Sequence, residues 1–269
     1  MPFRAARIRV RFAAVETVGN RDLEALSMTT ATRRPAFAPL ERDTMQERVY
    51  VELRQALMRG HFPPGEVLIV RALSDQFGTS HMPVRDALSR LVAEQALEVL
   101  PSRSVAVPML SRERCADVQE TRELLEGRAG ALAAARISEE DIAGLRALDH
   151  DMRAAISRRD VEEFVAANWQ FHFTLYALSE RPVMPRMIES LWLQIGPSLR
   201  GCIDEVARAP EIDSELTVDH HGEMLAALAR RDGEGVRRAV AADLRGLTDY
   251  LLAVLPSEPS VVRPLRRPS

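Results

Sequence analysis

The sequence predicts a mainly α protein in two parts, and three observations support this prediction. Between Asp43 and Pro108, short helical patterns are followed by two short apolar runs on either side of a turn. After Ser111, apolar residues recur at helical spacing as far as residue 254, with only short breaks. That second part contains no candidate strand, so we expect an all-α helical bundle there. We place the two domains at 41–108 and 109–256, between tails at 1–40 and 257–269.

The first part, residues 41–108, has the pattern of a small helical domain, which we call the head. Apolar residues at every fourth position from Met45 to Leu57 predict the first helix, which Gly60 ends. A second short helix is expected over 71–77, where Gly78 stops it. Ser80 is a suitable N-cap for a third helix, and Pro83 suits its first turn.

Two apolar runs complete the head. Residues 97–100 and 105–107 read as strands joined by the turn 101–104, which predicts a hairpin wing. Two short helices around a Gly-Thr-Ser turn, followed by this hairpin, predict a winged helix-turn-helix.

The second part reads as about six amphipathic helices with short breaks. Ser138 followed by Asp141 resembles a capping box at the start of one of them. The expected helices cover 112–135, 139–158, 160–179, 183–206, 211–230 and 233–254.

Composition narrows the class of protein. Apolar residues make up 46%, which suffices for a core, and no apolar run is long enough to span a membrane. We find no secretory signal, and the two distant cysteines suit a reducing cytoplasm better than a disulfide framework. The net charge of −3 gives no general support to nucleic-acid binding, so that case depends on where particular arginines lie.

The head places several polar and basic residues where a helix-turn-helix contacts DNA. The second helix of such a motif reads the major groove through its N-terminal residues, and a wing reaches the flanking backbone. Surface arginines can equally serve solubility alone. The DNA-binding candidates are Arg71, Ser80, His81, Met82, Arg85 and Arg103.

Four residues in the second part form a candidate metal site. Asn168 and His172 are four residues apart on one helical face, His221 lies on an apolar face, and Asp243 interrupts an apolar stripe. A buried carboxylate needs a partner, and two imidazoles with oxygen ligands suit zinc, nickel, manganese or iron. A hydrogen-bonded polar cluster in a helical core is the alternative.

Arg122 is the candidate for effector binding. It lies on the core-facing stripe of its helix, where a guanidinium can bind an anion. The alternative is a salt bridge to Glu126, four residues later.

The head resembles the GntR family of regulators. The resemblance covers about residues 45–107 and rests on Gly78-Thr79-Ser80 followed by Pro83-Val84-Arg85-Asp86-Ala87-Leu88 and Leu91. His81 stands where the family usually has arginine, and histidine makes a shorter, single-point contact to a base. Ser104 replaces the usual wing-tip glycine, and Gln95-Ala96 replaces a glycine-containing turn.

The second part is similar to the FCD effector domain of the FadR subfamily. The matching segments are Arg122-x-x-Leu125-Glu126, Asn168-x-x-Phe171-His172, His221-x-x-Met224-Leu225, and Asp232 followed by Asp243. The family's metal ligands are Asp, His, His and His in chain order. In this sequence Asn168 stands at the first position and Asp243 at the last. The site therefore keeps one carboxylate and three neutral ligands, as in the family. The resemblance implies a divalent metal, a small carboxylate effector beside it, and a homodimer.

We therefore predict a ligand-responsive transcriptional regulator, more specifically a repressor, that binds double-stranded operator DNA. Two alternatives from other classes are a metal-dependent enzyme and a metal-free structural or interaction protein on the same helical core. The sequence contains no convincing general base beside the candidate ligands and no nucleophile or cofactor motif, so we expect no catalytic residues.

Overall fold

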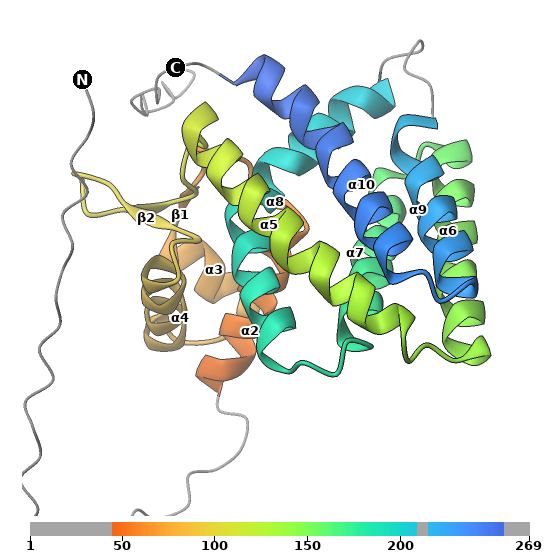
Figure 1. The fold of residues 1–269 in the computed structure, drawn as a ribbon. Helices are drawn as coiled ribbons and strands as arrows, with labels where there is room; N and C mark the ends of the chain where they lie inside the picture. Colours follow the sequence, from red (N-terminus) through yellow and green to blue (C-terminus); the bar gives the residue numbers. More distant parts are fainter. Residues whose placement is uncertain (1–44, 209–214, 256–269) are drawn as a thin grey trace, which may run out of the picture. The chain divides into compact units, whose positions relative to one another are not determined.

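The computed structural model describes residues 45–208 and 215–255, and the side chains of 206–219 are excluded from the description. The tails expected at 1–40 and 257–269 lie outside these ranges. All described residues fall within one compact unit, residues 43–269 (Figure 1). No helix in these ranges is both long and apolar enough to cross a membrane.

The head forms the predicted winged helix-turn-helix. Its helices are α2 (Met45–Met58), α3 (Val70–Phe77) and α4 (His81–Ala93). Gly78 ends α3 with a left-handed backbone, φ +61°, which glycine adopts at little cost. Val84, Leu88 and Leu91 face the core from α4, as the helical period predicts.

The wing belongs to a sheet of three short strands. These are β1 (Val67–Leu68), β2 (Glu98–Val99) and β3 (Val105–Ala106), in the order β1-β3-β2 with antiparallel pairing. Val67 pairs with Ala106, and Val99 pairs with Val105. The predicted hairpin is present, whereas the pairing of β1 with it was not predicted.

The second part is a bundle of helices α5 to α10, close to the predicted ranges. They span Arg112–Ala134, Glu139–Arg158, Val161–Ala177, Val183–Arg208, Glu215–Ala229 and Gly233–Val254. Helix α10 lies along α5, and α6 lies beside α9 (Figure 1). The predicted capping box is present at the start of α6, where Ser138 and Asp141 exchange hydrogen bonds.

Helix α2 of the head packs tightly against α8 of the bundle (Figure 1). A methyl group added at Gly196 of α8 would lie 2.6 Å from the carbonyl oxygen of Met58. Nη1 of Arg54 lies 2.8 Å from Oε2 of Glu189, which adds an ion pair to this contact. The end of the head's first helix is therefore held against the bundle, and this places it beside the site described below.

Candidate functional site

The six DNA-binding candidates are all exposed on the head. Helix α4 presents His81, Met82 and Arg85, and Arg71 lies in the first turn of α3. Their exposure is compatible with DNA contact but does not test it. Ser80 occupies the N-cap position of α4, but its hydroxyl accepts no cap hydrogen bond. The predicted N-cap position is therefore confirmed without a side-chain cap, and the exposed hydroxyl remains available to an outside partner.

Two non-glycine residues of the wing region adopt a left-handed backbone. Arg103 has φ +65° in the turn between β2 and β3, and Gln95 has φ +60° after α4. The Arg103 N–H donates to the carbonyl oxygen of Leu100 at 2.8 Å, which closes the wing turn. The turns that lack the family's glycines therefore keep a glycine-like backbone, and Arg103 projects from the tip of the wing.

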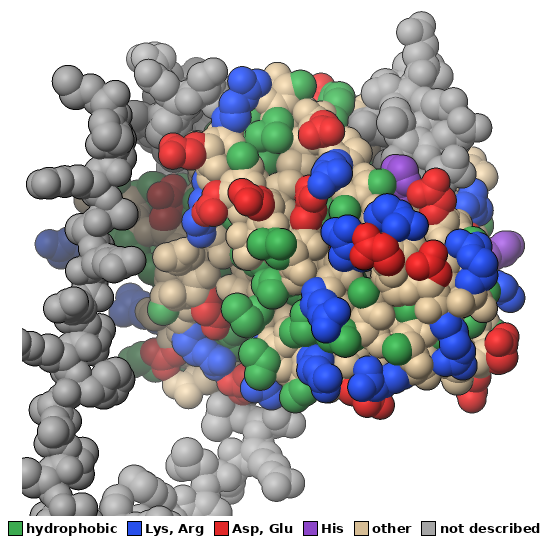
Figure 2. Space-filling view, in the orientation of Figure 1, with side chains coloured by type: hydrophobic (Ala, Val, Ile, Leu, Met, Phe, Trp, Pro, Cys, Tyr) green, Lys and Arg blue, Asp and Glu red, His purple; other side chains and the backbone are tan. Residues whose placement is uncertain are grey.

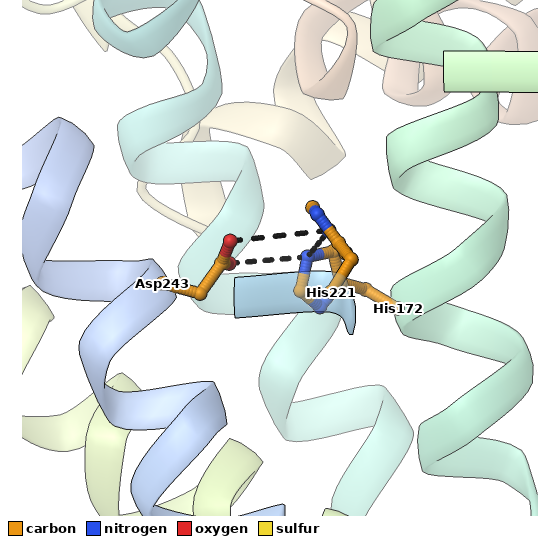
Figure 3. A group of neighbouring side chains, drawn as sticks. All are labelled: His172, His221 and Asp243. Carbon is orange, nitrogen blue, oxygen red and sulfur yellow. Dashed lines mark hydrogen bonds and ion pairs between the residues drawn. The ribbon is translucent and has the colours of Figure 1, made fainter. Parts of the chain in front are cut away.

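The bundle brings three of the four metal candidates together (Figure 3). His172 comes from α7, His221 from α9 and Asp243 from α10. The Nε2 atoms of the two histidines are 3.2 Å apart, and Oδ2 of Asp243 lies 3.3 Å from Nε2 of His172. Oδ1 of Asp243 lies 3.9 Å from Nε2 of His221. Both histidines are buried.

The spacing of these atoms fits a metal ion. Two ligands that each lie about 2.0–2.1 Å from one ion are separated by roughly 3.0–3.4 Å. The separations of 3.2 and 3.3 Å fall in that range. Three donors from three helices converge on one point, as a first coordination shell requires.

A hydrogen bond fixes the proton on His172. The Tyr176 hydroxyl donates to Oε2 of Glu126 at 2.6 Å, so toward Nδ1 of His172, 2.9 Å away, it can only accept. In the neutral imidazole the proton is then on Nδ1, and Nε2 presents its lone pair to His221 and Asp243. This lone pair can either accept a hydrogen bond from an Nε2–H of His221, 3.2 Å away, or coordinate a metal ion.

The pKa values of two buried acids at this site are shifted from their ordinary values. Burial raises the pKa of the Asp243 carboxyl, but the neighbouring His221 and His172 outweigh burial and hold this pKa at about 2. Burial and the Glu126 carboxylate raise the pKa of Tyr176 well above its ordinary value. Asp243 is therefore an anion, and Tyr176 remains a protonated donor.

Arg122 forms the salt bridge to Glu126 that was the alternative to effector binding, and it also lines a pocket. Its Nε donates to Oε1 of Glu126 at 2.6 Å, and both side chains are buried. Its guanidinium carbon lies 4.7 Å from the ring centre of Trp192, whose indole N–H donates to the same Glu126 oxygen. Among the described residues, the two terminal nitrogens of Arg122 have no hydrogen-bond acceptor.

A pocket that is partly open to solvent joins the metal candidates to Arg122. His172, Asp243 and Asn168 line it, which places the fourth metal candidate at the same cavity. Phe164, Trp169 and Trp192 form apolar walls. The combination of apolar walls with a few polar and charged groups is that of a small-molecule site.

Several residues of this site were not assigned roles from the sequence. Tyr176 and Trp192 are two of them, because their bonds to Glu126 depend on how α5, α7 and α8 pack. Met58 and Arg59, at the end of the head's first helix, also line the pocket. Nothing in the local pattern around residue 58 indicates a neighbour in the bundle.

Comparison with known proteins shows to which family the chain belongs. The chain matches the family described as bacterial regulatory proteins, gntR family, over residues 45–107, and the FCD domain over residues 117–246. It is 31% identical to the HTH-type transcriptional regulator McbR of Escherichia coli over 207 residues, which cover 77% of this chain and 92% of McbR. The chain belongs to the GntR family.

Further relatives and solved structures agree with this assignment. This GntR-family chain is 24% identical to the HTH-type transcriptional repressor RspR of Escherichia coli, over 76% of this chain and 88% of RspR. It is also 24% identical to the gluconate operon transcriptional repressor of Bacillus licheniformis, over 72% of this chain and 79% of that protein.

The structure of E. coli McbR/YncC matches with a TM-score of 0.71 at 31% identity, over 78% of this chain and 97% of that chain. A GntR regulator from Rhodococcus sp. RHA1 shares the fold, with a TM-score of 0.64 at 20% identity over 78% and 99% of the two chains. This GntR-family protein is thus a ligand-responsive, DNA-binding transcriptional regulator with an FCD effector domain, and not an enzyme.

Proposed function

We propose that this regulator is a homodimeric repressor that releases its operator when a small carboxylate binds beside a divalent metal in the bundle. The observation that carries this proposal is the shared pocket. It is lined at once by His172 and Asp243 of the metal cluster and by Arg122, whose terminal nitrogens have no acceptor within the described ranges. Relatives named as repressors support the direction of the response.

In this proposal His172, His221 and Asp243 hold the metal, and Asn168 contributes a weaker amide oxygen. A bound divalent ion would supply a Lewis-acidic position for one oxygen of the effector. Arg122 binds a carboxylate of the effector through its terminal nitrogens, while Glu126 fixes the orientation of the guanidinium. Zinc, nickel, manganese and iron all suit this ligand set.

Metal analysis tests the first half of the proposal. The purified protein should bind one divalent ion per chain in calorimetric titrations with Zn²⁺, Ni²⁺ and Mn²⁺. His172→Ala and His221→Ala should abolish that binding, and Asn168→Ala should weaken it less. His150→Ala is the matched control, because the His150 side chain is 83% exposed and is not one of the metal candidates. A native protein that binds none of these ions would favour the metal-free polar cluster.

The second half of the proposal, carboxylate binding by Arg122, must be tested with variants that still fold. Removing Arg122 alone leaves the fully buried Glu126 carboxylate without its cation, which costs about 3–5 kcal/mol and endangers the fold. Arg122→Lys keeps a positive charge but loses the planar fork, and Arg122→Gln with Glu126→Gln removes both charges together. Both variants should lose most of the carboxylate affinity of the metal-loaded protein. Unchanged affinity in both would contradict the role of Arg122.

On the DNA side, we propose that Arg85, His81 and Met82 contact base edges, and that Arg71, Ser80 and Arg103 contact the backbone. A selection of random duplexes on the native protein should enrich an inverted repeat, as expected for a two-fold dimer. Arg85→Ala should lose that enrichment, whereas Arg103→Ala should weaken binding to all sequences alike. Equal enrichment by the native protein and Arg85→Ala would contradict base reading by Arg85.

A further inference from the structure

We propose that Arg59, contributed by the DNA-binding head, is a second anion-binding residue of the effector pocket. The effector is then a molecule with two anionic groups joined by an apolar spacer, of which a dicarboxylate is the simplest case. This inference rests on the proposed function, because it takes Arg122 as the site of the first carboxylate.

Arg59 is a head residue that lies at a bundle pocket. It follows Met58, the last residue of α2, and both residues line the cavity that contains His172 and Asp243. Arg59 is only half-buried. Among the described side chains, those of residues 45–205 and 220–255, no carboxylate forms an ion pair with Arg59.

The other two arginines of the pocket already have partners. Nε of Arg122 bonds to Glu126, and Arg200 lies 2.9 Å from Glu162 and 3.1 Å from Asp204. Arg59 is therefore the one pocket arginine in the described ranges whose charge is not balanced by a neighbouring acid. An arginine that lines a cavity and has no neighbouring acid favours an anion from outside the chain.

The wall of the cavity indicates the middle of the ligand. Phe164, Trp169, Trp192 and Leu244 line it with apolar surface. A hydrocarbon or aromatic spacer buries this surface favourably, whereas a polar spacer would lose hydrogen bonds to water. These four residues favour an apolar segment between the charged ends of the ligand.

The backbone of Arg59 and the two residues that follow it contact side chains of the bundle. Nη1 of Arg200 donates to the Arg59 carbonyl oxygen at 3.4 Å. The next residue, Gly60, has φ +71°, and a methyl group there would lie 2.2 Å from Cβ of Arg200. His61 then pairs with Glu162 at 2.8 Å. The second anion contact therefore exists only while α2 is docked on α8, so a dianionic effector binds the docked form preferentially.

The test compares acids that differ by one charged group. Full-length, metal-loaded protein is titrated calorimetrically with hexanoate and adipate, which have the same number of carbons, and then with succinate, glutarate and suberate. The variants are Arg59→Gln, Arg122→Lys, and Arg48→Gln as the control. Arg48 is an exposed arginine of the same helix α2 and does not line the pocket.

The best-fitting dicarboxylate should bind the native protein and Arg48→Gln about tenfold or more tightly than the monocarboxylate, as one additional charge-assisted contact provides. Arg59→Gln should lower the dicarboxylate affinity to that of the monocarboxylate and leave the monocarboxylate affinity unchanged. Arg122→Lys should weaken both acids.

Two results would overturn the inference while the proposed function stands. In one, the monocarboxylate binds through Arg122 and no dicarboxylate binds more tightly. In the other, Arg59→Gln leaves the advantage of the dicarboxylate intact. If no acid binds, or if Arg122→Lys has no effect on binding, the proposed function itself fails and the second contact fails with it.

Discussion

Glu126 is the residue that joins the two halves of the effector pocket. Its buried carboxylate accepts from Nε of Arg122, from the Tyr176 hydroxyl and from the Trp192 indole. Tyr176 in turn contacts Nδ1 of His172. One carboxylate thus orients both the proposed anion-binding arginine and a proposed metal ligand, as outer-shell partners do in metal sites.

Replacement of Tyr176 by Phe tests this connection. Loss of the hydroxyl removes the partner of His172 and should weaken metal binding by about 10- to 100-fold. It also removes a donor from the buried Glu126, which should lower the free energy of unfolding by about 1–3 kcal/mol. Calorimetric metal titration and urea denaturation measure the two effects.

The matched control is Tyr250→Phe, because Tyr250 packs against a second apolar cluster and does not itself line the pocket. Unchanged metal affinity in Tyr176→Phe would mean that the tyrosine does not orient His172.

Sequence periodicity predicted the residues of the site better than their partners. His172, His221 and Asp243 could be found because polar residues on apolar helical stripes are conspicuous, and Arg122 with Glu126 because both lie on one helix face. The roles of Tyr176 and Trp192 could not be predicted, because each bonds to Glu126 on a different helix. Such contacts arise from tertiary packing, which leaves no local period.

At the scale of elements, α2 and α8 can pack closely because Gly196 of α8 has no side chain. Gly196 precedes Pro197 inside α8, where proline supplies no backbone donor. The backbone of α2 approaches so closely at Gly196 that a methyl group would overlap the Met58 carbonyl. A glycine-proline pair in a helix therefore marks the docking point of the head.

Gly196→Ala should separate the two helices. The added methyl group meets backbone at 2.6 Å, so we expect the free energy of unfolding to fall by about 1–3 kcal/mol. Gly201→Ala is the matched control on the same helix, because its methyl group would meet nothing within 4 Å. The control should be neutral or more stable by up to about 1 kcal/mol. Equal effects in urea denaturation would contradict tight docking at Gly196.

The capping box of α6 predicts a pH dependence. Hydrogen bonds from the Ser138 side chain and backbone lower the pKa of the Asp141 carboxyl. A carboxyl whose folded pKa lies below its unfolded pKa contributes stability above the unfolded pKa, and that stability is lost as the pH falls through the folded pKa.

Ser138→Ala should therefore cost about 1 kcal/mol at neutral pH and less in acid. Denaturation at several pH values between neutrality and acid measures this difference. A cost independent of pH would mean that Asp141 does not take part in the cap.

Elements with a clear period were predicted closely, and those without one were not. The helices of the bundle lie near their predicted ranges because each buries an apolar face. Strand β1 has only two residues, so its pairing with β3 has no recognisable sequence pattern. The position of the end of α2 at the pocket results from the packing of the two domains against each other. Sequence periodicity does not predict such packing.

The molecule as a whole carries a small negative charge, −3, so its attraction to DNA must be local. On the face shown in Figure 2, basic and acidic side chains are interspersed and no large surface of one sign appears. Operator binding then depends on a few arginines of the head and on how the two heads of the proposed dimer are spaced. Because α2 belongs to the head and also lines the effector pocket, ligand binding can change that spacing.

The most direct test of this account is the affinity of the metal-loaded protein for its selected operator duplex, measured by fluorescence anisotropy as the best-binding carboxylate is added. We predict that the operator Kd rises by about fivefold or more at saturating acid, the usual size of allosteric coupling. Arg122→Lys should bind the operator as the native protein does but should not respond to the acid. An operator Kd that stays constant while calorimetry shows the pocket to be saturated would contradict the account.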